Sequence, residues 1–361
     1  MSLYLDYNAS APVWPEVLEA MTEVYRSYPG NADSRTHIFG TNAAKVVQDS
    51  RNTVAGVLGA DPADVIFTSG STESNNTCIL GIEDYAQRTG KKHIITTAIE
   101  HKSVLEPARY LAGRGFSVDY VRPDASGRIS AGQLLSLVRE DTVLVSVMYV
   151  NSETGIIQPV EEIGPALKER GVLFHVDATQ ALGKLNPGIR ALHYDMLSVS
   201  AHKIGGPQGI GALVLRRDTD HRRPPVRPLM YGGGQEGNLR SGTENTLGIL
   251  ALGEAVRTWD VTAVDRMRQL KNRLRSALLA RIPEARVNGP VDGVNTCAPH
   301  ILNLSLTPVR SQTMLFALEG DGVYVSAGSA CASRKQKISP VLRAMGVSTE
   351  QADCALRFSL S

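Results

Sequence analysis

Lys203 stands in a stretch that is suited to covalent chemistry. The sequence SAHKIGGPQGIG covers residues 200–211 and lies between the apolar segments 196–199 and 212–215. This pattern predicts a strand, a tight polar turn and a second strand. A lysine just after the end of a strand is placed to form a covalent bond with a carbonyl carbon. A solvated loop lysine is the commoner explanation for a single residue, so the interpretation depends on what the rest of the chain adds.

Polar side chains also follow other apolar segments that are typical of buried strands. Ser71 and Thr72 follow the segment 65–70, and His101 and Asn151 follow two later ones. In an open α/β sheet the ligand binds beyond the carboxyl ends of the strands, so we expect these residues to lie close together. Hydroxyl and free N–H groups at the start of a helix suit a phosphate, although an ordinary helix cap explains Ser71 and Thr72 equally well. His101 is suited to cover a flat ring or to carry a proton, and Asn151 offers an amide.

Asp177 ends the apolar segment 172–177, and Gln180 follows it closely. A carboxylate at the end of a buried strand is costly unless a cation or a hydrogen-bond donor neutralises it. The protonated nitrogen of a pyridine ring would do so. A phosphate cradle, a buried acid, amides, a histidine that can stack and a lysine together predict a site for pyridoxal phosphate, bound covalently to Lys203.

The order of the segments predicts an α/β fold with a mostly parallel central sheet, because short β-rich segments alternate with helical ones. We expect strands within 65–70, 93–97, 118–121, 143–150, 172–177, 196–199 and 212–215, and helices at 15–28, 42–58, from 71, from about 100, near 133, from 161, 245–259 and 265–282. Beyond Pro283 we expect strands at 300–306 and 356–360 and helices near 312–318 and 340–345, which indicate a smaller α+β domain. We therefore expect a large cofactor-binding domain at 15–258 and a small domain formed by 1–14 and 259–361.

The composition narrows the function further. With 361 residues, 42% of them apolar and a net charge of +2, the chain offers no dedicated surface for nucleic acid or an anionic membrane. It shows neither a basic-then-apolar leader nor an apolar run of the roughly 20 residues that a membrane span needs. Four scattered cysteines argue against a disulfide framework, and the pair Cys297 and His300 has no second pair to complete a metal site. We expect a cytoplasmic protein without a metal.

Eight motifs in this order resemble those of one family: YLDYNASAP, FTSGSTES, EHKSVL, HVDATQ, SAHKIGGPQGIGAL, RSGTEN, SAGSAC and LRFSL. The chain resembles the cysteine desulfurases of the class V aminotransferase superfamily, the group of the NifS and IscS enzymes, over essentially its whole length. The resemblance implies the fold type I architecture of pyridoxal phosphate enzymes, the conversion of L-cysteine to L-alanine, and a homodimer.

The resemblance also implies roles for single residues. Lys203 holds pyridoxal phosphate, Asp177 pairs with the pyridine nitrogen, His101 stacks on the ring, and Arg357 binds the substrate carboxylate. The other implied contacts are Gln180 and Asn151 at the phenolic oxygen, Asn151 also beside the substrate, and Ser71, Thr72, Ser200, His202 and, from the neighbouring subunit, Thr243 at the phosphate.

Cys331 is the nucleophile that the resemblance implies. It lies in SAGSACAS, where nearly every neighbour is small, and such a composition favours a solvated, mobile loop. Cys78 and Cys354 instead have bulky apolar neighbours, as buried structural cysteines do. The resemblance implies that Cys331 attacks the sulfur of the substrate and then carries a persulfide to an acceptor protein.

Two features depart from the family pattern. The expected motif Asn-Asn-Glu is Asn151-Ser152-Glu153 here, which we expect to alter the substrate side of the pocket. The chain ends at Ser361, soon after Arg357, where family members continue through further helix. We therefore expect the small domain to lack a packing element.

Alternatives to a cysteine desulfurase remain open at this point. One is a selenocysteine lyase or another class V pyridoxal phosphate enzyme, and the other is a sulfur-relay docking protein that binds the cofactor but turns over poorly. The acceptor also stays open among an iron–sulfur scaffold, a tRNA-thiolation relay and a DNA sulfur-modification system.

Overall fold

A seven-stranded sheet organises the computed structural model, which describes residues 2–27, 30–185, 188–290, 293, 296–328 and 338–361. The strand order is β2-β8-β7-β6-β5-β3-β4. The strands are β2 (Val65–Thr68), β3 (His93–Thr97), β4 (Ser117–Val121), β5 (Thr142–Met148), β6 (Leu173–Asp177), β7 (Met196–Ser200) and β8 (Gly211–Leu215). All neighbours are parallel except β8, which runs antiparallel to both β2 and β7. The predicted α/β fold with a mostly parallel sheet is confirmed.

Helices pack on both faces of this sheet because its strands are apolar on both sides. The neighbouring residues Ile94 and Ile95 of β3 are both buried and enter two different apolar clusters, one on each face. The helices of this part are α1 (Pro15–Ser27), α2 (Ile38–Leu58), α3 (Ser71–Gly81), α4 (Glu83–Thr89), α5 (Lys102–Ala112), α6 (Ala131–Ser136), α7 (Val160–Glu169), α8 (Gly188–Ala191) and α9 (Thr246–Arg257), with short 3₁₀ helices η1 (Pro62–Asp64), η2 (Ala201–Lys203) and η3 (Glu236–Asn238). Strands that are buried on both faces are typical of a parallel sheet.

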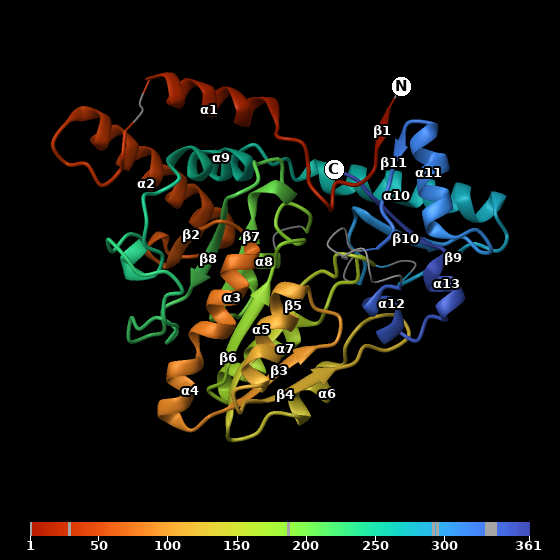
Figure 1. Cartoon of the computed structure of the whole chain (residues 1–361), viewed down its shortest axis with the longest axis horizontal. Coiled ribbons are helices and arrows are strands. Elements are labelled where there is room, and N and C mark those ends of the chain that lie inside the picture. Colours follow the sequence, from red (N-terminus) through yellow and green to blue (C-terminus); the bar gives the residue numbers. More distant parts are fainter. Residues whose placement is uncertain (1, 28–29, 186–187, 291–292, 294–295, 329–337) are drawn as a thin grey trace.

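A second group of elements lies at the other end of the molecule (Figure 1). It contains a three-stranded antiparallel sheet in the order β12-β10-β9 and a two-stranded parallel sheet of β1 and β11. Its elements are β1 (Leu3–Tyr4), α10 (Thr262–Arg281), β9 (Arg286–Val287), β10 (Ile301–Ser305), α11 (Ser311–Gly320), β11 (Val323–Tyr324), α12 (Pro340–Ala344), α13 (Thr349–Asp353) and β12 (Ala355–Ser359). Leu5, Leu304 and Leu356 share one buried apolar cluster there. The two ends of the chain therefore fold together, as the expected small domain requires, while its exact boundaries stay a prediction.

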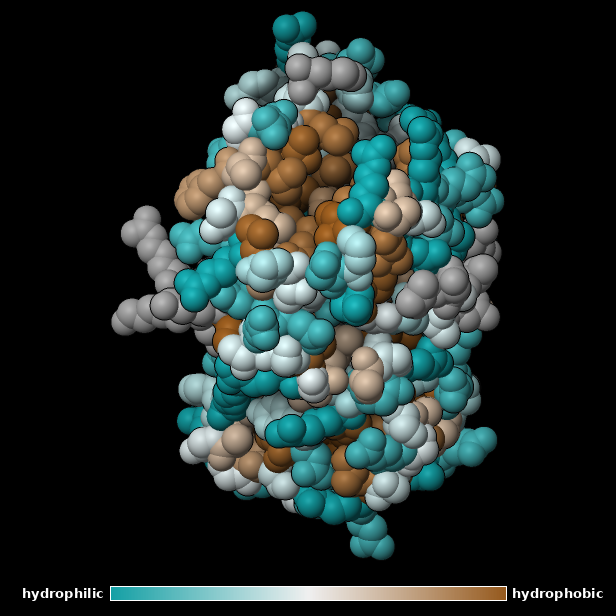
Figure 2. Space-filling model, turned by 90° about the vertical axis from the view of Figure 1, so that its right-hand side faces the viewer, coloured by the Kyte–Doolittle hydropathy of each residue, from teal (hydrophilic) through white to brown (hydrophobic). Residues whose placement is uncertain are grey.

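The surface of this second group is partly apolar. Figure 2 looks onto this end of the molecule and shows brown side chains gathered in a hollow. Large exposed apolar side chains on its elements include Leu3, Leu270, Leu279, Phe316 and Tyr324. None of the helices in the described residues combines the length and the apolar character that a membrane crossing would need.

Candidate active site

A cavity of about 280 Å³ opens where β5, β6 and β7 end. It brings together eight of the residues predicted from the sequence: Ser71, Thr72, His101, Asp177, Gln180, His202, Lys203 and Arg357. Asn151, Ser200 and Thr243 do not line it. A larger, shallow groove of about 690 Å³ runs beside α4 and residues 225–227. Its lining contains no lysine, histidine or cysteine, whereas Lys203, His101 and Asp177 meet in the smaller cavity.

Lys203 ends the short helix η2, which follows β7 directly. Its Nζ donates to the main-chain oxygens of Asn8 and Ala9 at 2.5 and 2.9 Å. The turn after the lysine needs a glycine, because Gly205 has a φ of +83° and a Cβ there would lie 2.4 Å from the Trp14 ring. The N-terminal segment thereby packs directly against the turn that carries Lys203.

The start of α3 forms one wall of the cavity. Its N-cap is Gly70, which has a φ of +147°, and no described side chain caps the free N–H groups of the first turn. Gly211 allows this close approach, since a Cβ there would lie 2.7 Å from the Cα of Gly70. An uncapped helix start favours an anion such as a phosphate. Ser200 is buried beneath this turn, with its Oγ 3.5 Å from the position that a Cβ on Gly70 would take.

His202 adds an unsatisfied polar atom to the cavity wall. Its Nδ1 is buried and has no hydrogen-bond partner among the described residues. Burial and the nearby charge of Lys203 lower the pKa of His202 to about 4. The ring is therefore neutral at pH 7 and has one nitrogen left to bond a ligand. Together with the uncapped helix start, this orphaned atom fits the phosphate end of pyridoxal phosphate.

Two buried side chains, Asn75 and Ser103, connect the acid of the cavity to its histidine. Nδ2 of Asn75 donates to Oδ2 of Asp177 at 2.8 Å and to Oγ of Ser103 at 2.9 Å. Nδ1 of His101 lies 2.7 Å from the same Oγ and accepts from the Ser103 N–H at 3.2 Å. Because Nδ1 is an acceptor, a neutral His101 carries its proton on Nε2. Thr179 donates twice to Oδ1 of Asp177, through its N–H and its hydroxyl.

Asn75 and Ser103 were not predicted as site residues. Asn75 lies four residues after Ser71 on α3, so both can face the same side of that helix. Ser103 is the second residue after His101, which is the N-cap of α5. The position in each helix is the signal that would have found them, but it becomes informative only when the cavity side of the helix is known.

The two predicted amides differ in their surroundings. Gln180 lines the cavity, and its Oε1 lies 3.4 Å from Nε2 of the buried His300. Asn151 is 1% exposed and is saturated by protein contacts. Its Oδ1 accepts three hydrogen bonds from Glu153 and Thr154, and its Nδ2 donates to the Ile99 oxygen. In this structure Asn151 shapes the turn after β5, and a contact from it to a cofactor would require the exchange of one of these bonds.

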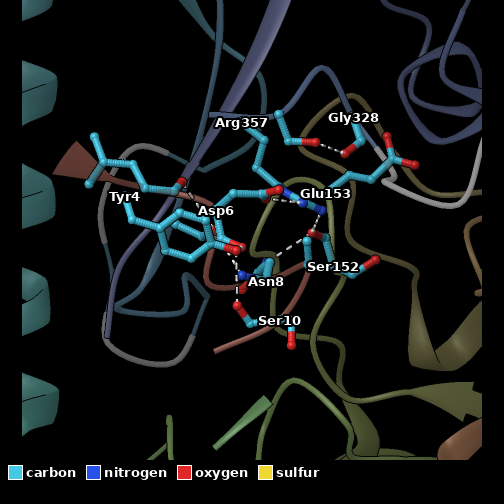
Figure 3. A network of polar contacts seen from close by, with 12 residues as sticks. Tyr4, Asp6, Asn8, Ser10, Ser152, Glu153, Gly328 and Arg357 are labelled. Carbon is cyan, nitrogen blue, oxygen red and sulfur yellow. Dashed lines mark hydrogen bonds and ion pairs between the residues drawn. The ribbon is translucent and has the colours of Figure 1, made fainter. Parts of the chain in front are cut away.

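Arg357 lines the cavity from β12, and Figure 3 shows its polar contacts. Its Nη2 donates to Oδ1 of Asp6 at 2.7 Å, and its Nη1 donates to the Ser152 oxygen at 3.0 Å. The Ser152 oxygen also accepts from Nδ2 of Asn8 at 3.0 Å. The contact from residue 152 is a main-chain carbonyl, so the departure from the motif Asn-Asn-Glu leaves this interaction with Arg357 unchanged.

A buried acid lies next to the strand ends. Glu100 accepts from the Thr97 hydroxyl at 2.7 Å and from the Met148 N–H at 2.9 Å, both through Oε1. Its Oε2 is buried and lacks a partner in the described part of the chain. Burial raises the pKa of this carboxyl to about 8. Glu100 is therefore largely protonated at pH 7, which removes a negative charge from beneath the site.

The loop with the motif RSGTEN lies outside this cavity. Thr243 is exposed in the single chain. Two ion pairs within the same chain hold the loop and the segment before it. Arg240 Nε lies 3.1 Å from Glu73 Oε1 in the first turn of α3, and Arg51 Nη1 donates to Glu236 Oε2, before the loop, at 2.9 Å. Glu236 also accepts from the Phe67 N–H at 2.7 Å. Both anchors lie before Thr243 in the sequence, and Thr243 itself is exposed.

The predicted nucleophile, Cys331, lies outside the described residues. Among the described residues the cysteines are Cys78, Cys297 and Cys354, and all three are buried and free. Burial raises the pKa of the Cys78 thiol strongly, and Cys297 accepts from Nζ of Lys271 at 3.1 Å. Cys297 and His300 are therefore engaged with Lys271 and Gln180.

Comparison with known proteins places the whole chain in one group. The family model described as aminotransferase class-V matches residues 3–361. The chain is 43% identical to the cysteine desulfurase IscS of Pectobacterium carotovorum subsp. carotovorum (strain PC1) over 100% of this chain and 88% of that relative. A solved structure titled NifS-like protein superposes with a TM-score of 0.89 at 38% identity, covering 100% of this chain and 94% of its own. The structure of SspA in complex with cysteine gives a TM-score of 0.86 at 34% identity and covers 99% of both chains.

Proposed function

Because this chain belongs to the aminotransferase class-V family as a cysteine desulfurase, we propose that it uses pyridoxal phosphate on Lys203 to take sulfur from L-cysteine. The observation that carries the proposal is one cavity lined by Lys203, Asp177, His101 and Arg357. It offers a nucleophilic amine, an acid, a flat ring and a carboxylate-binding cation within a single space of about 280 Å³. The complex of the similar SspA with cysteine supports the choice of substrate.

The phosphate would bind at the first turn of α3. Ser71 and Thr72 supply hydroxyl and N–H groups there, and His202, whose buried Nδ1 has no partner among the described residues, lines the same cavity. The buried Ser200 supports the turn at Gly70. Thr243 of the neighbouring subunit would complete the phosphate site.

The ring would lie between Asp177 and His101. When bound, pyridoxal phosphate supplies an electron sink that weakens a bond to the substrate α-carbon. Asp177 keeps the ring nitrogen protonated through its carboxylate, which Asn75 and Thr179 hold in place. His101 presents its ring and its Nε2 proton because Ser103 occupies Nδ1. Gln180, and Asn151 after an exchange of partners, would reach the phenolic oxygen.

Arg357 and Lys203 would handle the substrate. The guanidinium of Arg357 binds the α-carboxylate through parallel hydrogen bonds, which a lysine cannot copy. Lys203 would move the α-proton, because its amine lies in the same cavity as Arg357 and a lysine amine can act as a general base.

Cys331 would perform the sulfur step. Its thiolate attacks the sulfur of the bound cysteine, so that an S–S bond forms and the C–S bond of the substrate breaks. The two electrons of the broken bond stay with the substrate carbon, which takes up a proton and leaves as L-alanine. Cys331 is left as a persulfide for an acceptor protein in iron–sulfur cluster assembly, tRNA thiolation or DNA sulfur modification. The described cysteines are buried, so none of them competes with Cys331 for the substrate.

The active form would be a homodimer with two shared sites. Thr243 is exposed and lies outside the cavity of its own chain. Large apolar side chains are exposed on α1, at the start of α2 and near the glycine run 232–234: Leu18, Tyr25, Ile38, Phe39 and Tyr231. These segments lie at the same end of the molecule (Figure 1). A second copy of this chain would cover them and deliver Thr243. We also place the protein in the cytoplasm, where its free thiols stay reduced.

The experiment is a single-turnover assay with L-cysteine on the purified protein, in which alanine and protein-bound persulfide are measured together. The proposal predicts equal amounts of alanine and persulfide in the wild-type protein and neither in Cys331→Ala, which keeps its cofactor. Cys354→Ala serves as the matched control and should form both products. Alanine formation at the normal rate by Cys331→Ala would refute the sulfur step. Release of alanine from selenocysteine but not from cysteine would refute the choice of substrate.

A further inference from the structure

The Arg357 guanidinium is held from two sides by segments that are distant in the sequence (Figure 3). Asp6 binds Nη2 through its Oδ1 at 2.7 Å, although 351 residues separate the two side chains. The Ser152 oxygen binds Nη1 at 3.0 Å. Two acceptors on two different nitrogens fix both the position and the plane of a guanidinium.

Asp6 also supplies the charge that a buried arginine needs. Arg357 is 2% exposed, and a cation at such a position is costly without a partner. Asp6 is the one carboxylate that forms an ion pair with Arg357 among the described residues. Glu153 lies nearby, but its Oε2 accepts from the Ser339 hydroxyl, and the described residues show no ion pair between Glu153 and Arg357. The compensating charge therefore comes from Asp6.

The segment that carries Asp6 is anchored independently of Arg357. Leu5 donates to the Tyr324 oxygen at 2.8 Å, and the Asn8 N–H donates to Oγ of Ser359 at 2.9 Å. The Tyr4 hydroxyl donates to the main-chain oxygen of Asp6 at 3.1 Å. These bonds keep Asp6 beside β12, so the position of its carboxylate does not depend on its contact with the guanidinium.

We propose that Asp6 is the positioning residue that orients Arg357 toward the substrate carboxylate. A guanidinium has five N–H groups, and the contacts to Asp6 and Ser152 use two of them. The remaining N–H groups keep a constant direction only while Asp6 holds the plane. This inference rests on the proposed function, in which Arg357 binds the carboxylate, and it makes the N-terminal segment part of the substrate site.

The test uses two amines that differ only in a carboxylate. L-alanine carries the carboxylate and ethylamine lacks it, and neither has a sulfur that can be transferred. Their binding to the holoenzyme is followed by the change in its visible absorption, and the cofactor content is measured separately. For Asp6→Ala we expect the dissociation constant of L-alanine to rise at least tenfold, that of ethylamine to change less than twofold, and the cofactor content to stay the same. The KM for cysteine should rise in parallel with the alanine constant.

Asp6→Asn is the second variant, and it keeps an acceptor oxygen at nearly the same place. We expect Asp6→Asn to raise the dissociation constant of L-alanine about threefold and to leave that of ethylamine unchanged. This variant keeps the inference testable if Asp6→Ala does not fold. Asp220→Ala is the matched control, because Asp220 pairs with Arg222 at the surface at 3.4 Å, and it should change neither constant.

Arg357→Lys separates the inference from the function on which it rests. If Arg357→Lys weakens the binding of L-alanine but not of ethylamine, while both Asp6 variants bind L-alanine normally, Asp6 does not position Arg357. The assignment of Arg357 to the substrate carboxylate then still holds. If Arg357→Lys leaves the ratio of the two constants unchanged, Arg357 does not bind the carboxylate and the proposed substrate site is wrong.

Discussion

Nδ2 of Asn75 donates to Oδ2 of Asp177 at 2.8 Å, at the point where the first buried turns of α3 meet the end of β6. Both side chains are buried, with exposures of 0% and 5%. The same Nδ2 also reaches Ser103, which holds the ring of His101. One amide therefore helps to set the position of the acid and, through Ser103, that of the histidine.

Asn75→Ala should weaken cofactor binding without removing it. The substitution deletes one donor to the Asp177 carboxylate and one to Ser103, and each lost bond to a buried polar group costs about 1–3 kcal/mol. We expect the dissociation constant of pyridoxal phosphate to rise roughly tenfold or more, measured by absorbance titration of the cofactor-free protein. Asn52→Ala, at an exposed position of α2, is the control and should bind normally. Unchanged binding by Asn75→Ala would show that Asp177 does not need this donor.

Arg240→Ala should damage the site of the other subunit more than its own. Arg240 pairs with Glu73 at 3.1 Å and lies three residues before Thr243, which faces outward. Without this pair the loop loses one of its two anchors, and Thr243 would no longer be held toward the neighbouring phosphate.

Hybrid dimers measure this effect directly. One subunit carries Lys203→Ala, so the other subunit alone can hold the cofactor covalently. We expect cofactor affinity to fall several-fold when Arg240→Ala is in the lysine-free subunit, and less when it is in the lysine-bearing one. If cofactor affinity falls only when Arg240→Ala is in the lysine-bearing subunit, the loop contributes to the site of its own subunit. Arg222→Ala, at an exposed position, should have no effect in either arrangement.

Glu100→Gln should change the pH dependence of stability. Burial raises the pKa of Glu100 to about 8 in the folded state, from 4.5. Between these two pH values the unfolded chain releases a proton that the folded protein keeps, so the carboxyl destabilises the fold increasingly as pH rises. A glutamine carries no such penalty. The unfolding temperature of Glu100→Gln should match the wild type near pH 5 and exceed it by about 2–5 °C at pH 8.

Asn52→Ala, an exposed substitution on α2 that removes no ionisable group, is the control for this measurement and should show no difference that depends on pH. A constant difference between Glu100→Gln and the wild type across the range from pH 5 to 8 would mean that Glu100 is ionised in the folded protein.

The sequence predicts those parts of the site that lie at the ends of apolar strands. Asp177 and Lys203 follow directly from buried segments, so their convergence could be inferred from the rule that ligands bind at strand ends. Asp6 could not be found in this way, because its partner Arg357 lies 351 residues away and local pattern carries no information on such a contact. Asn151 follows a strand as well, yet its side-chain oxygen accepts hydrogen bonds from the turn that follows it.

Apolar periodicity has a similar limit in the helices. Met267, Leu270 and Leu274 are spaced by three and four residues, so they lie on one face of the helix predicted at 265–282, yet Met267 is buried while Leu270 is 41% exposed. The pattern gives the face of a helix, but the length over which another element covers that face is decided by tertiary packing.

The most direct test of the central claim, that the cavity around Lys203 is the cofactor site, is reduction of the holoenzyme with borohydride followed by peptide mapping. The wild-type protein should be yellow, and the reduced cofactor should be recovered on the peptide that contains Lys203. Lys203→Ala should give no labelled peptide and no alanine from cysteine. Recovery of the label on another lysine, or an unchanged adduct in Lys203→Ala, would contradict the account.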